Sequence, residues 1–191
     1  MKSVKGTKTE HNLLAAFAGE SQARNRYTYF ASKAKKEGYE QISAIFQETA
    51  DNEKEHAKRF FSFLEGGEVQ VTAAFPAGVV GTTVDNLKAA AMGENEEHTK
   101  LYPAAAEIAE QEGFKEIASL FRLIAKVEQH HEQRYLMLMK NIQDGKVFKK
   151  DQSEKWICRN CGYIHEGKEA LDTCPACLHA KAHFELLCDH F

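Results

Sequence analysis

The stretch Glu37-Gly38-Tyr39-Glu40-Gln41-Ile42, followed by Glu53-x-x-His56, occurs twice in this chain. The second copy, 75 residues later, reads Glu112-Gly113-Phe114-Lys115-Glu116-Ile117 and is followed by Glu128-x-x-His131. A Glu and a His three residues apart lie on the same face of a helix, about one turn from each other. The repeat therefore predicts two similar helical hairpins, each presenting a carboxylate and an imidazole on one face.

The spacing of apolar residues around the repeat predicts a mainly α-helical protein. We expect helices over residues 9–36, 40–65, 83–112 and 114–142. Residues 68–80 have no helical period and are too long for a tight turn, so they predict a crossover between the two hairpins. Four helices with one long crossover have the connectivity of a ferritin-like four-helix bundle.

Local signals refine these boundaries. Thr82 and Asp85 have the spacing of a capping box, and Gly38 is placed to end the first helix. Pro103 predicts a kink or a break inside the third helix. The charged residues 149–155 predict a linker. We therefore expect two domains, a helical bundle over residues 1–148 and a small metal-binding β domain over residues 153–191.

Each half of the repeat also contains a glutamate upstream of its Glu-x-x-His. Gly19-Glu20 corresponds to Gly93-Glu94 at an offset of 74 residues. One Glu from each of two helices and a Glu-x-x-His from each of the other two is the di-iron carboxylate pattern. The predicted ligands of two metal ions are Glu20, Glu53, His56, Glu94, Glu128 and His131.

A single Glu-x-x-His is usually a solvated pair, but here two copies and two apolar contexts argue against that interpretation. Glu20 follows Phe17-Ala18-Gly19, and Glu94 follows Ala89-Ala90-Ala91-Met92-Gly93. Buried carboxylates cost several kcal/mol each unless cations or protons compensate them. The repeat is also asymmetric, because Glu97 lies one turn beyond Glu94 where the first half has Ala23. Glu97 is therefore a candidate additional ligand for one metal only.

Other polar residues near these motifs have weaker signals. Tyr27 and Tyr102 lie about two turns beyond Glu20 and Glu94 and can donate hydrogen bonds to a ligand carboxylate or to a bound peroxide. Ordinary core tyrosines would have the same spacing. We interpret His98 and His130 as surface residues, and Glu96 as a solvated charge.

All five cysteines lie in the last fifth of the chain. Cys158-x-x-Cys161 and Cys174-x-x-Cys177 are separated by 12 residues, a spacing at which four thiolates bind one tetrahedral metal. The metal is iron or zinc, since ligand type alone does not distinguish them. Trp156, Tyr163, Phe184 and Leu186 are expected to wrap this site. Cys188 is left over and is interpreted as a bystander thiol.

The composition of the chain limits which kinds of binding partner can be expected. A net charge of −3 over 191 residues gives no electrostatic reason to expect nucleic acid or an anionic membrane. No apolar run approaches the roughly 20 residues of a membrane helix, and residues 1–6 contain no apolar segment of a signal peptide. We therefore expect a cytoplasmic protein, in which clustered cysteines bind metal rather than form disulfides.

With both metal motifs in view, the chain closely resembles the rubrerythrins over nearly its whole length. The resemblance rests on Gly19-Glu20-Ser21-Gln22-Ala23-Arg24, on both Glu-x-x-His motifs, on Glu94-x-x-Glu97, and on the short spacing between the cysteine pairs. It implies a non-haem di-iron centre held by the predicted Glu and His ligands together with Glu97. It also implies a rubredoxin-like FeCys4 site.

What the resemblance implies about activity is specific. Rubrerythrins are peroxidases that reduce hydrogen peroxide to water, with electrons from NAD(P)H through redox proteins such as rubredoxin or its reductase. They form homodimers, alone or in larger assemblies, in which the FeCys4 site of one subunit approaches the di-iron site of the other. One iron exchanges His56 for Glu97 as its oxidation state changes.

Two other functions fit the same residues. A ferroxidase or iron-handling protein would use the bundle to oxidise Fe²⁺ for storage, and would take up more iron than its two bundle positions hold. A structural or metal-regulated protein would hold zinc in the cysteine module and would be colourless.

Overall fold

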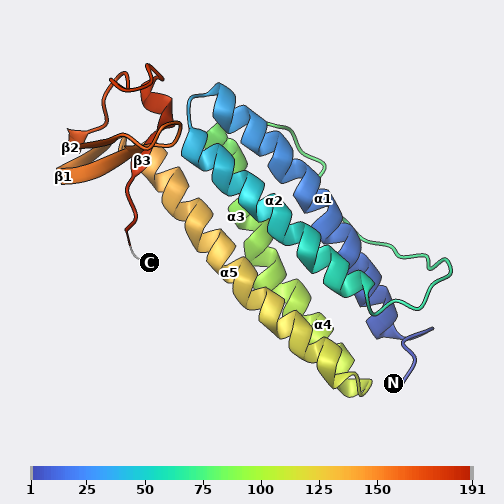
Figure 1. Cartoon of the computed structure of the whole chain (residues 1–191). Coiled ribbons are helices and arrows are strands. Elements are labelled where there is room, and N and C mark those ends of the chain that lie inside the picture. Colours follow the sequence, from blue (N-terminus) through green and yellow to red (C-terminus); the bar gives the residue numbers. More distant parts are fainter. Residues whose placement is uncertain (1, 190–191) are drawn as a thin grey trace.

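The computed structural model describes residues 2–189 and has a long helical bundle with a small β module at one end (Figure 1). The helical segments are α1 (Lys8–Lys36), α2 (Glu40–Phe61), α3 (Thr83–Glu96), the π-helix η1 (Glu97–Leu101), α4 (Tyr102–Gln111) and α5 (Lys115–Gln143). α1 packs along α2, and the α3–η1–α4 segment packs along α5. The predicted four-helix bundle of two hairpins is confirmed.

The turns of the two hairpins repeat as the sequence does. Gly38 and Gly113 both have φ of +84°, a left-handed conformation that a side chain disfavours and that commonly ends helices. The predicted capping box is also present, since the Thr82 side chain accepts from Asp85 N–H and the Asp85 side chain accepts from Thr82 N–H. The glycines and caps therefore fix where each helix of the bundle starts and stops.

The predicted interruption of the third helix is present immediately before Pro103. The π-helix η1 ends at Leu101, and Pro103 lies in the first turn of α4, where its ring and its missing N–H disfavour a regular α-helical turn before it. Glu20 and Glu94 are 74 residues apart, whereas Tyr27 and Tyr102 are 75 apart. α1 is uninterrupted over this region, so the extra residue of the second half is accommodated as one wider turn.

The crossover, residues 62–82, runs back along the outside of α1 (Figure 1). It begins earlier than predicted, because α2 ends at Phe61 rather than near Glu65. Its Phe75 ring lies against Gly19 of α1, with Cε1 at 3.6 Å from where a Cβ would stand. The crossover therefore covers α1 close to Glu20.

The β module is a three-stranded antiparallel sheet in the order β2-β1-β3. Its strands are β1 (Lys149–Cys158), β2 (Ile164–Glu169) and β3 (Phe184–Leu186), with a short 3₁₀ helix, η2 (Lys181–His183), before β3. The predicted linker over residues 149–155 is wrong, because these residues form most of β1 and Lys149 pairs with Glu169. We propose that the module is a separate domain beginning at Lys149. Leu186, expected in the wrap of this module, is 37% exposed.

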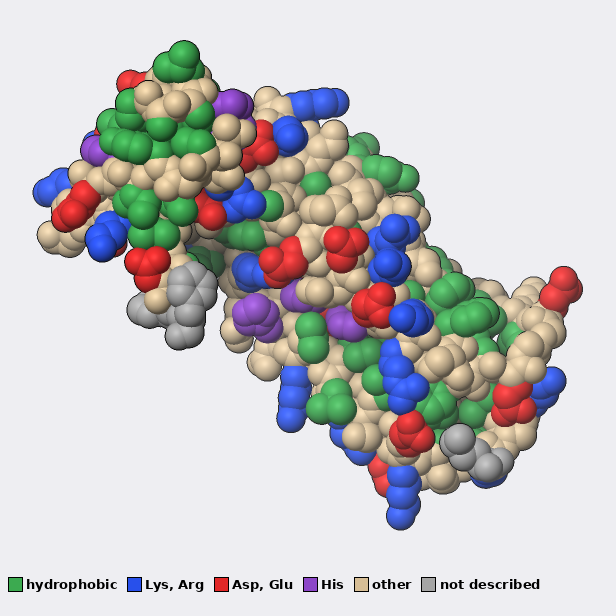
Figure 2. All heavy atoms as spheres, in the orientation of Figure 1, with side chains coloured by type: hydrophobic (Ala, Val, Ile, Leu, Met, Phe, Trp, Pro, Cys, Tyr) green, Lys and Arg blue, Asp and Glu red, His purple; other side chains and the backbone are tan. Residues whose placement is uncertain are grey.

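Two apolar clusters fill the bundle, and the predicted ligands lie between them. One cluster contains Leu13, Phe60 and Phe121, and the other contains Phe30 and Phe46. On each helix the buried glutamate falls in sequence between members of the two clusters. On the face drawn in Figure 2, acidic and basic side chains are mixed along the bundle. No helix within residues 2–189 is long and apolar enough to span a membrane.

Candidate metal centres

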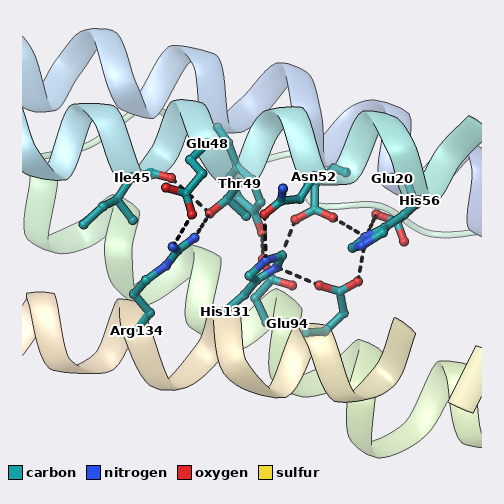
Figure 3. Close-up of polar contacts among 12 residues, drawn as sticks. Glu20, Ile45, Glu48, Thr49, Asn52, His56, Glu94, His131 and Arg134 are labelled. Carbon is teal, nitrogen blue, oxygen red and sulfur yellow. Dashed lines mark hydrogen bonds and ion pairs between the residues drawn. The ribbon is translucent and has the colours of Figure 1, made fainter. Parts of the chain in front are cut away.

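Side chains from all four long helical segments converge inside the bundle (Figure 3). Their ligand atoms form two groups, in each of which all atoms lie within 4.8 Å of one another. The first group is Glu20, Glu53, His56 and Glu128, and the second is Glu53, Glu94, Glu128 and His131. Glu53 and Glu128 belong to both groups, as bridging carboxylates between two metal ions would. All six predicted bundle ligands are therefore brought together.

Helical spacing sets the geometry of this cluster. His56 Nδ1 lies 2.9 Å from Glu53 Oε2, one turn away on α2, and 3.0 Å from Glu128 Oε1 on α5. His131 Nδ1 lies 2.8 Å from Glu128 Oε2 and 3.3 Å from Glu53 Oε1. Each imidazole therefore faces one carboxylate of its own helix and one of the opposite helix. The two Glu-x-x-His motifs are related by an approximate twofold arrangement.

Most of the atoms in this cluster lack hydrogen bonds. Among residues 2–189, one oxygen each of Glu20, Glu53 and Glu94, both oxygens of Glu128, and His131 Nδ1 are buried without a hydrogen-bond partner. His131 and Glu128 meet at 2.8 Å without the alignment of a hydrogen bond. Unsatisfied buried polar atoms are costly, and two cations placed among them would satisfy them together. The donor set of carboxylates and imidazoles suits iron.

Tyr27 and Tyr102 cross between the two halves of the bundle. The Tyr27 hydroxyl donates to Glu94 Oε1 at 2.5 Å, and the Tyr102 hydroxyl donates to Glu20 Oε1. Tyr27 follows Glu20 on α1 but bonds to Glu94, and Tyr102 follows Glu94 but bonds to Glu20. Each tyrosine therefore contacts the predicted ligand of the other half of the repeat. Both hydroxyls are buried, and burial together with the adjacent carboxylate raises the pKa of each well above its usual value. The ordinary-core interpretation does not describe them, because both contact predicted ligands.

Glu97 lies at the edge of the cluster rather than inside it. It does not join either group of close ligand atoms, although it lies near enough to Glu94, Glu53 and Glu128 for their charges to act on it. It is half-buried at the first position of η1. Burial, reinforced by the charges of Glu128 and Glu53, raises its pKa to about 8. A wider helical turn therefore presents a protonatable carboxyl at the edge of the cluster, and the first half of the repeat has only Ala23 in its place.

The charge of the cluster is unbalanced without cations. Burial and the charge of Glu53 raise the pKa of Glu20 well above its usual value, and burial with Glu53 and Glu128 does the same for Glu94. Burial opposes ionisation of Glu53, but the imidazoles of His131 and His56, which both lie against its carboxylate, outweigh burial and lower its pKa to about 2. The metal-free cluster thus compensates its carboxylates with protons.

Metal removal should therefore make stability fall with rising pH. Glu97, with its pKa raised from 4.5 to about 8, stabilises the fold below pH 4.5 and loses this contribution as pH rises through about 8. His131 loses its contribution in the same way as pH rises from 6.5 through about 9, because the adjacent carboxylates of Glu128 and Glu53 outweigh the effect of burial and raise its pKa to about 9. We expect the melting temperature of chelated protein to drop by roughly 5–10 °C from pH 6 to pH 8.5.

Thermal unfolding of the chelated protein at several pH values checks this expectation. Glu97→Gln should flatten the decline, while Glu96→Gln, at an exposed neighbouring position, should leave it unchanged. Adding metal should restore stability most strongly at high pH, because metal binding displaces protons from the ligands. A metal-free protein that gains stability between pH 6 and 8.5 would contradict the account.

Sequence reasoning missed a set of polar residues that position the histidines. His131 Nε2 lies 3.3 Å from Asn52 Oδ1, on the residue before Glu53 (Figure 3). Such an outer partner fixes the orientation of a metal-binding imidazole. The repeat offered a faint signal, since Val127 occupies the corresponding position of the second half. His98, interpreted as a surface residue, is instead half-buried with Nε2 at 2.6 Å from Glu132 Oε2. His130 is exposed as expected.

The four cysteines also converge, at the end of the β module. The Sγ atoms of Cys158 and Cys177 lie 3.7 Å apart, and those of Cys161 and Cys174 lie 3.6 Å apart. Sulfurs at about 2.3 Å from a tetrahedral metal are about 3.8 Å from one another, so the spacing fits one ion. Backbone N–H of His179 donates to Cys177 and lowers its pKa to about 6, which favours the thiolate. Cys188 is exposed and outside the group.

The bundle with its buried Glu–His cluster and the four-cysteine module together define a di-iron carboxylate protein with a rubredoxin-like metal site. The family model described as "Rubrerythrin" matches residues 11–139, and that described as "Rubrerythrin, rubredoxin-like domain" matches residues 156–185. The chain belongs to the rubrerythrin family.

Similar proteins cover almost the entire chain. The rubrerythrin of Porphyromonas gingivalis is 65% identical over 184 residues, which cover 96% of this chain and 92% of that protein. The rubrerythrin of Nitratidesulfovibrio vulgaris is 59% identical over 187 residues and covers 98% of both chains. Among solved structures, fully reduced, all-ferrous nigerythrin is 33% identical with a TM-score of 0.63, covering 97% of this chain and 92% of that one.

Proposed function

We propose that this protein is a non-haem di-iron peroxidase that reduces hydrogen peroxide to water. The observation that carries the proposal is that one chain combines a buried site for two metal ions with a separate four-cysteine site. Reduction of H₂O₂ to two water molecules requires two electrons and two protons. Bound iron would supply the electrons and act as a Lewis acid at the bundle site.

We assign the metal ligands from the two close groups of side chains and from the cysteines. The proposed bundle ligands are Glu20, Glu53, His56, Glu94, Glu128 and His131, with Glu97 as a further ligand to one position. The proposed ligands of the single iron are Cys158, Cys161, Cys174 and Cys177. Support comes from the convergence of six bundle residues and of the four cysteines. In the bundle it also comes from buried atoms without a hydrogen-bond partner, which belong to Glu20, Glu53, Glu94, Glu128 and His131.

The remaining groups of the site hold and orient protons. We propose that Tyr27 and Tyr102 keep the carboxylates of Glu94 and Glu20 in a fixed orientation through their hydroxyl groups. Glu97 is the candidate proton carrier, because its raised pKa of about 8 leaves its carboxyl protonated at neutral pH until metal or charge displaces the proton. Glu97 lines the adjacent cavity, so its carboxyl can exchange protons with a molecule bound there.

The proposed electron route starts at the cysteine module. The Tyr39 and Phe148 rings stack with centroids 6.3 Å apart, and His183 Nε2 lies 3.7 Å from Glu40 Oε1, so the module rests on the α1–α2 turn. The apolar cluster that contains Phe30 and Phe46 lies between that end of the bundle and the Glu–His cluster. We infer that the module of a second copy in a homodimer supplies the electrons, received from NAD(P)H through rubredoxin or its reductase. The proposed location is the cytoplasm.

An anaerobic stoichiometric oxidation tests the function. Protein with measured metal content is reduced and then mixed with one equivalent of hydrogen peroxide per bundle site, while the optical spectrum is followed. We expect fast two-electron re-oxidation and consumption of the peroxide. An iron-handling protein would instead oxidise and retain added Fe²⁺ beyond the two bundle positions. A colourless cysteine module containing zinc would contradict the proposed electron route.

Replacing Glu97 by alanine should separate peroxide reduction from metal binding. Because Glu97 lies outside both close ligand groups, most bundle iron should remain. Steady-state peroxide turnover should fall by roughly 10–100-fold, the usual effect of removing one positioned carboxyl group. Glu107→Ala, at an exposed position of α4 outside the cavity, is the matched control. Full peroxidase activity in the Glu97 variant would contradict its assigned role.

A further inference from the structure

A cavity of about 400 Å³ lies beside the di-iron cluster, and its size is difficult to reconcile with hydrogen peroxide alone. The cavity is partly open to solvent and is lined by residues of α1, the α3–η1–α4 segment, α5 and the crossover. Its polar end includes Glu97 and Tyr102, whose hydroxyl donates to Glu20. It therefore ends one side chain away from the proposed metal ligands.

The other walls of the cavity are largely apolar. The small and aromatic residues that line them are Ala15, Ala16, Phe75, Ala105 and Phe121. Small side chains make this space, and Gly19 and Gly93, the residues before the two repeated glutamates, contribute to it. Phe75 of the crossover packs over Gly19 and covers this side of the cavity.

The volume of the cavity favours an organic guest. A water molecule, nearly as large as hydrogen peroxide, occupies about 30 Å³, and a dry cavity of about 150 Å³ accepts benzene. Ligand pockets for small organic molecules usually begin near 300 Å³ and combine apolar walls with a few polar groups. Here the apolar residues share the lining with a limited set of polar ones, which are Asn12, Gln22, Arg26, Glu96, Glu97 and Tyr102.

We propose that this cavity binds the organic group of an alkyl hydroperoxide, ROOH, with the peroxide oxygens at the Glu97 end. The proposal rests on the peroxidase function and extends its substrate class. The O–O bond breaks, two electrons from the same reduced centres and two protons from solvent are taken up, and the products are the alcohol ROH and water. The apolar walls would then lower KM for a hydroperoxide with a hydrocarbon group relative to a polar one.

Binding is tested first without metal, using 2-phenylpropan-2-ol, the alcohol formed from cumene hydroperoxide. In chelated protein labelled at alanine methyl groups, we expect saturable shifts of the Ala16 and Ala105 resonances. Ala15→Phe fills the cavity and should weaken binding at least about tenfold. Ala104→Phe, on the exposed side of α4, should not change it. Absence of saturable shifts, or equal affinity in the Ala15 variant, would overturn the proposal.

Turnover by the iron-loaded protein supplies the second measurement. The ratio of kcat/KM for cumene hydroperoxide to that for hydrogen peroxide should fall about tenfold in Ala15→Phe and stay constant in Ala104→Phe. Phe75→Ala, in the exposed crossover and outside the bundle core, should lower the same ratio and serves if the Ala15 variant does not fold. Hydrogen peroxide turnover without alcohol binding overturns this inference alone. Alcohol binding without turnover of either peroxide overturns the proposed function instead.

Discussion

Replacing Glu128 by alanine should abolish both metal positions of the bundle at once. Glu128 belongs to both groups of close ligand atoms, and its two oxygens lie 3.0 Å from His56 Nδ1 and 2.8 Å from His131 Nδ1. Without it, each position loses one of its two bridging carboxylates, and only Glu53 still belongs to both groups. We expect metal analysis to find only the iron of the cysteine module, and peroxide turnover to fall more than about 100-fold.

The stability of the metal-free protein distinguishes a lost site from a lost fold. Removing one carboxylate from a cluster that already repels ionisation of Glu20 and Glu94 should leave the metal-free variant within about 1 kcal/mol of the parent. Added metal should no longer raise its melting temperature. Glu116→Ala, a substitution of an exposed glutamate on the same helix, is the matched control. Retention of two bundle irons in the Glu128 variant would refute the assignment.

Replacing Cys174 by serine should disconnect the bundle from its reductant. Cys174 is fully buried and lies 3.6 Å from Cys161, so its loss removes an interior ligand of the four-cysteine site. A small metal module typically unfolds when its site is broken. We expect the absorption bands of FeCys4 to vanish and turnover driven through redox proteins to fall to background. Chemically reduced protein should still consume one equivalent of peroxide.

The matched control for this experiment is Cys188→Ser, which changes an exposed cysteine outside the group. Its spectrum and its turnover should equal those of the parent. Continued reductase-driven turnover in the Cys174 variant would show that electrons reach the bundle without the module, contrary to the proposed route.

The part of the fold that the sequence predicted is the part determined by local spacing. Two copies of Glu-x-x-His, glycine helix ends and a capping box depend on residues within a few positions of each other, so the bundle and its six converging ligands could be expected. The pairs Cys158–Cys161 and Cys174–Cys177 were predictable for the same reason. Family membership, expected from these motifs, is confirmed by the two matching family models.

The parts that escaped prediction depend on contacts between distant segments. The charged residues 149–155 carry no strand pattern of their own and form β1 because they pair with β2. Asn52 gains its role only when α5 brings His131 against it. The π-helix left a trace in the sequence, the change of repeat offset between Glu94 and Tyr102, but an added residue alone does not say how a helix accommodates it. The features that could not be predicted are therefore features of tertiary packing, whereas the chemistry of the ligands could be predicted from the motifs.

The buried layer of carboxylates between two apolar clusters has a consequence for the protein in the cell. A chain that has not acquired iron contains buried carboxyl groups whose ionisation burial opposes and, at neutral pH, is less stable than a loaded one. Proteases degrade chains in proportion to how often they open, so freshly made copies that wait for iron are removed first. The amount of this protein would then follow the supply of iron, even while its synthesis stays constant.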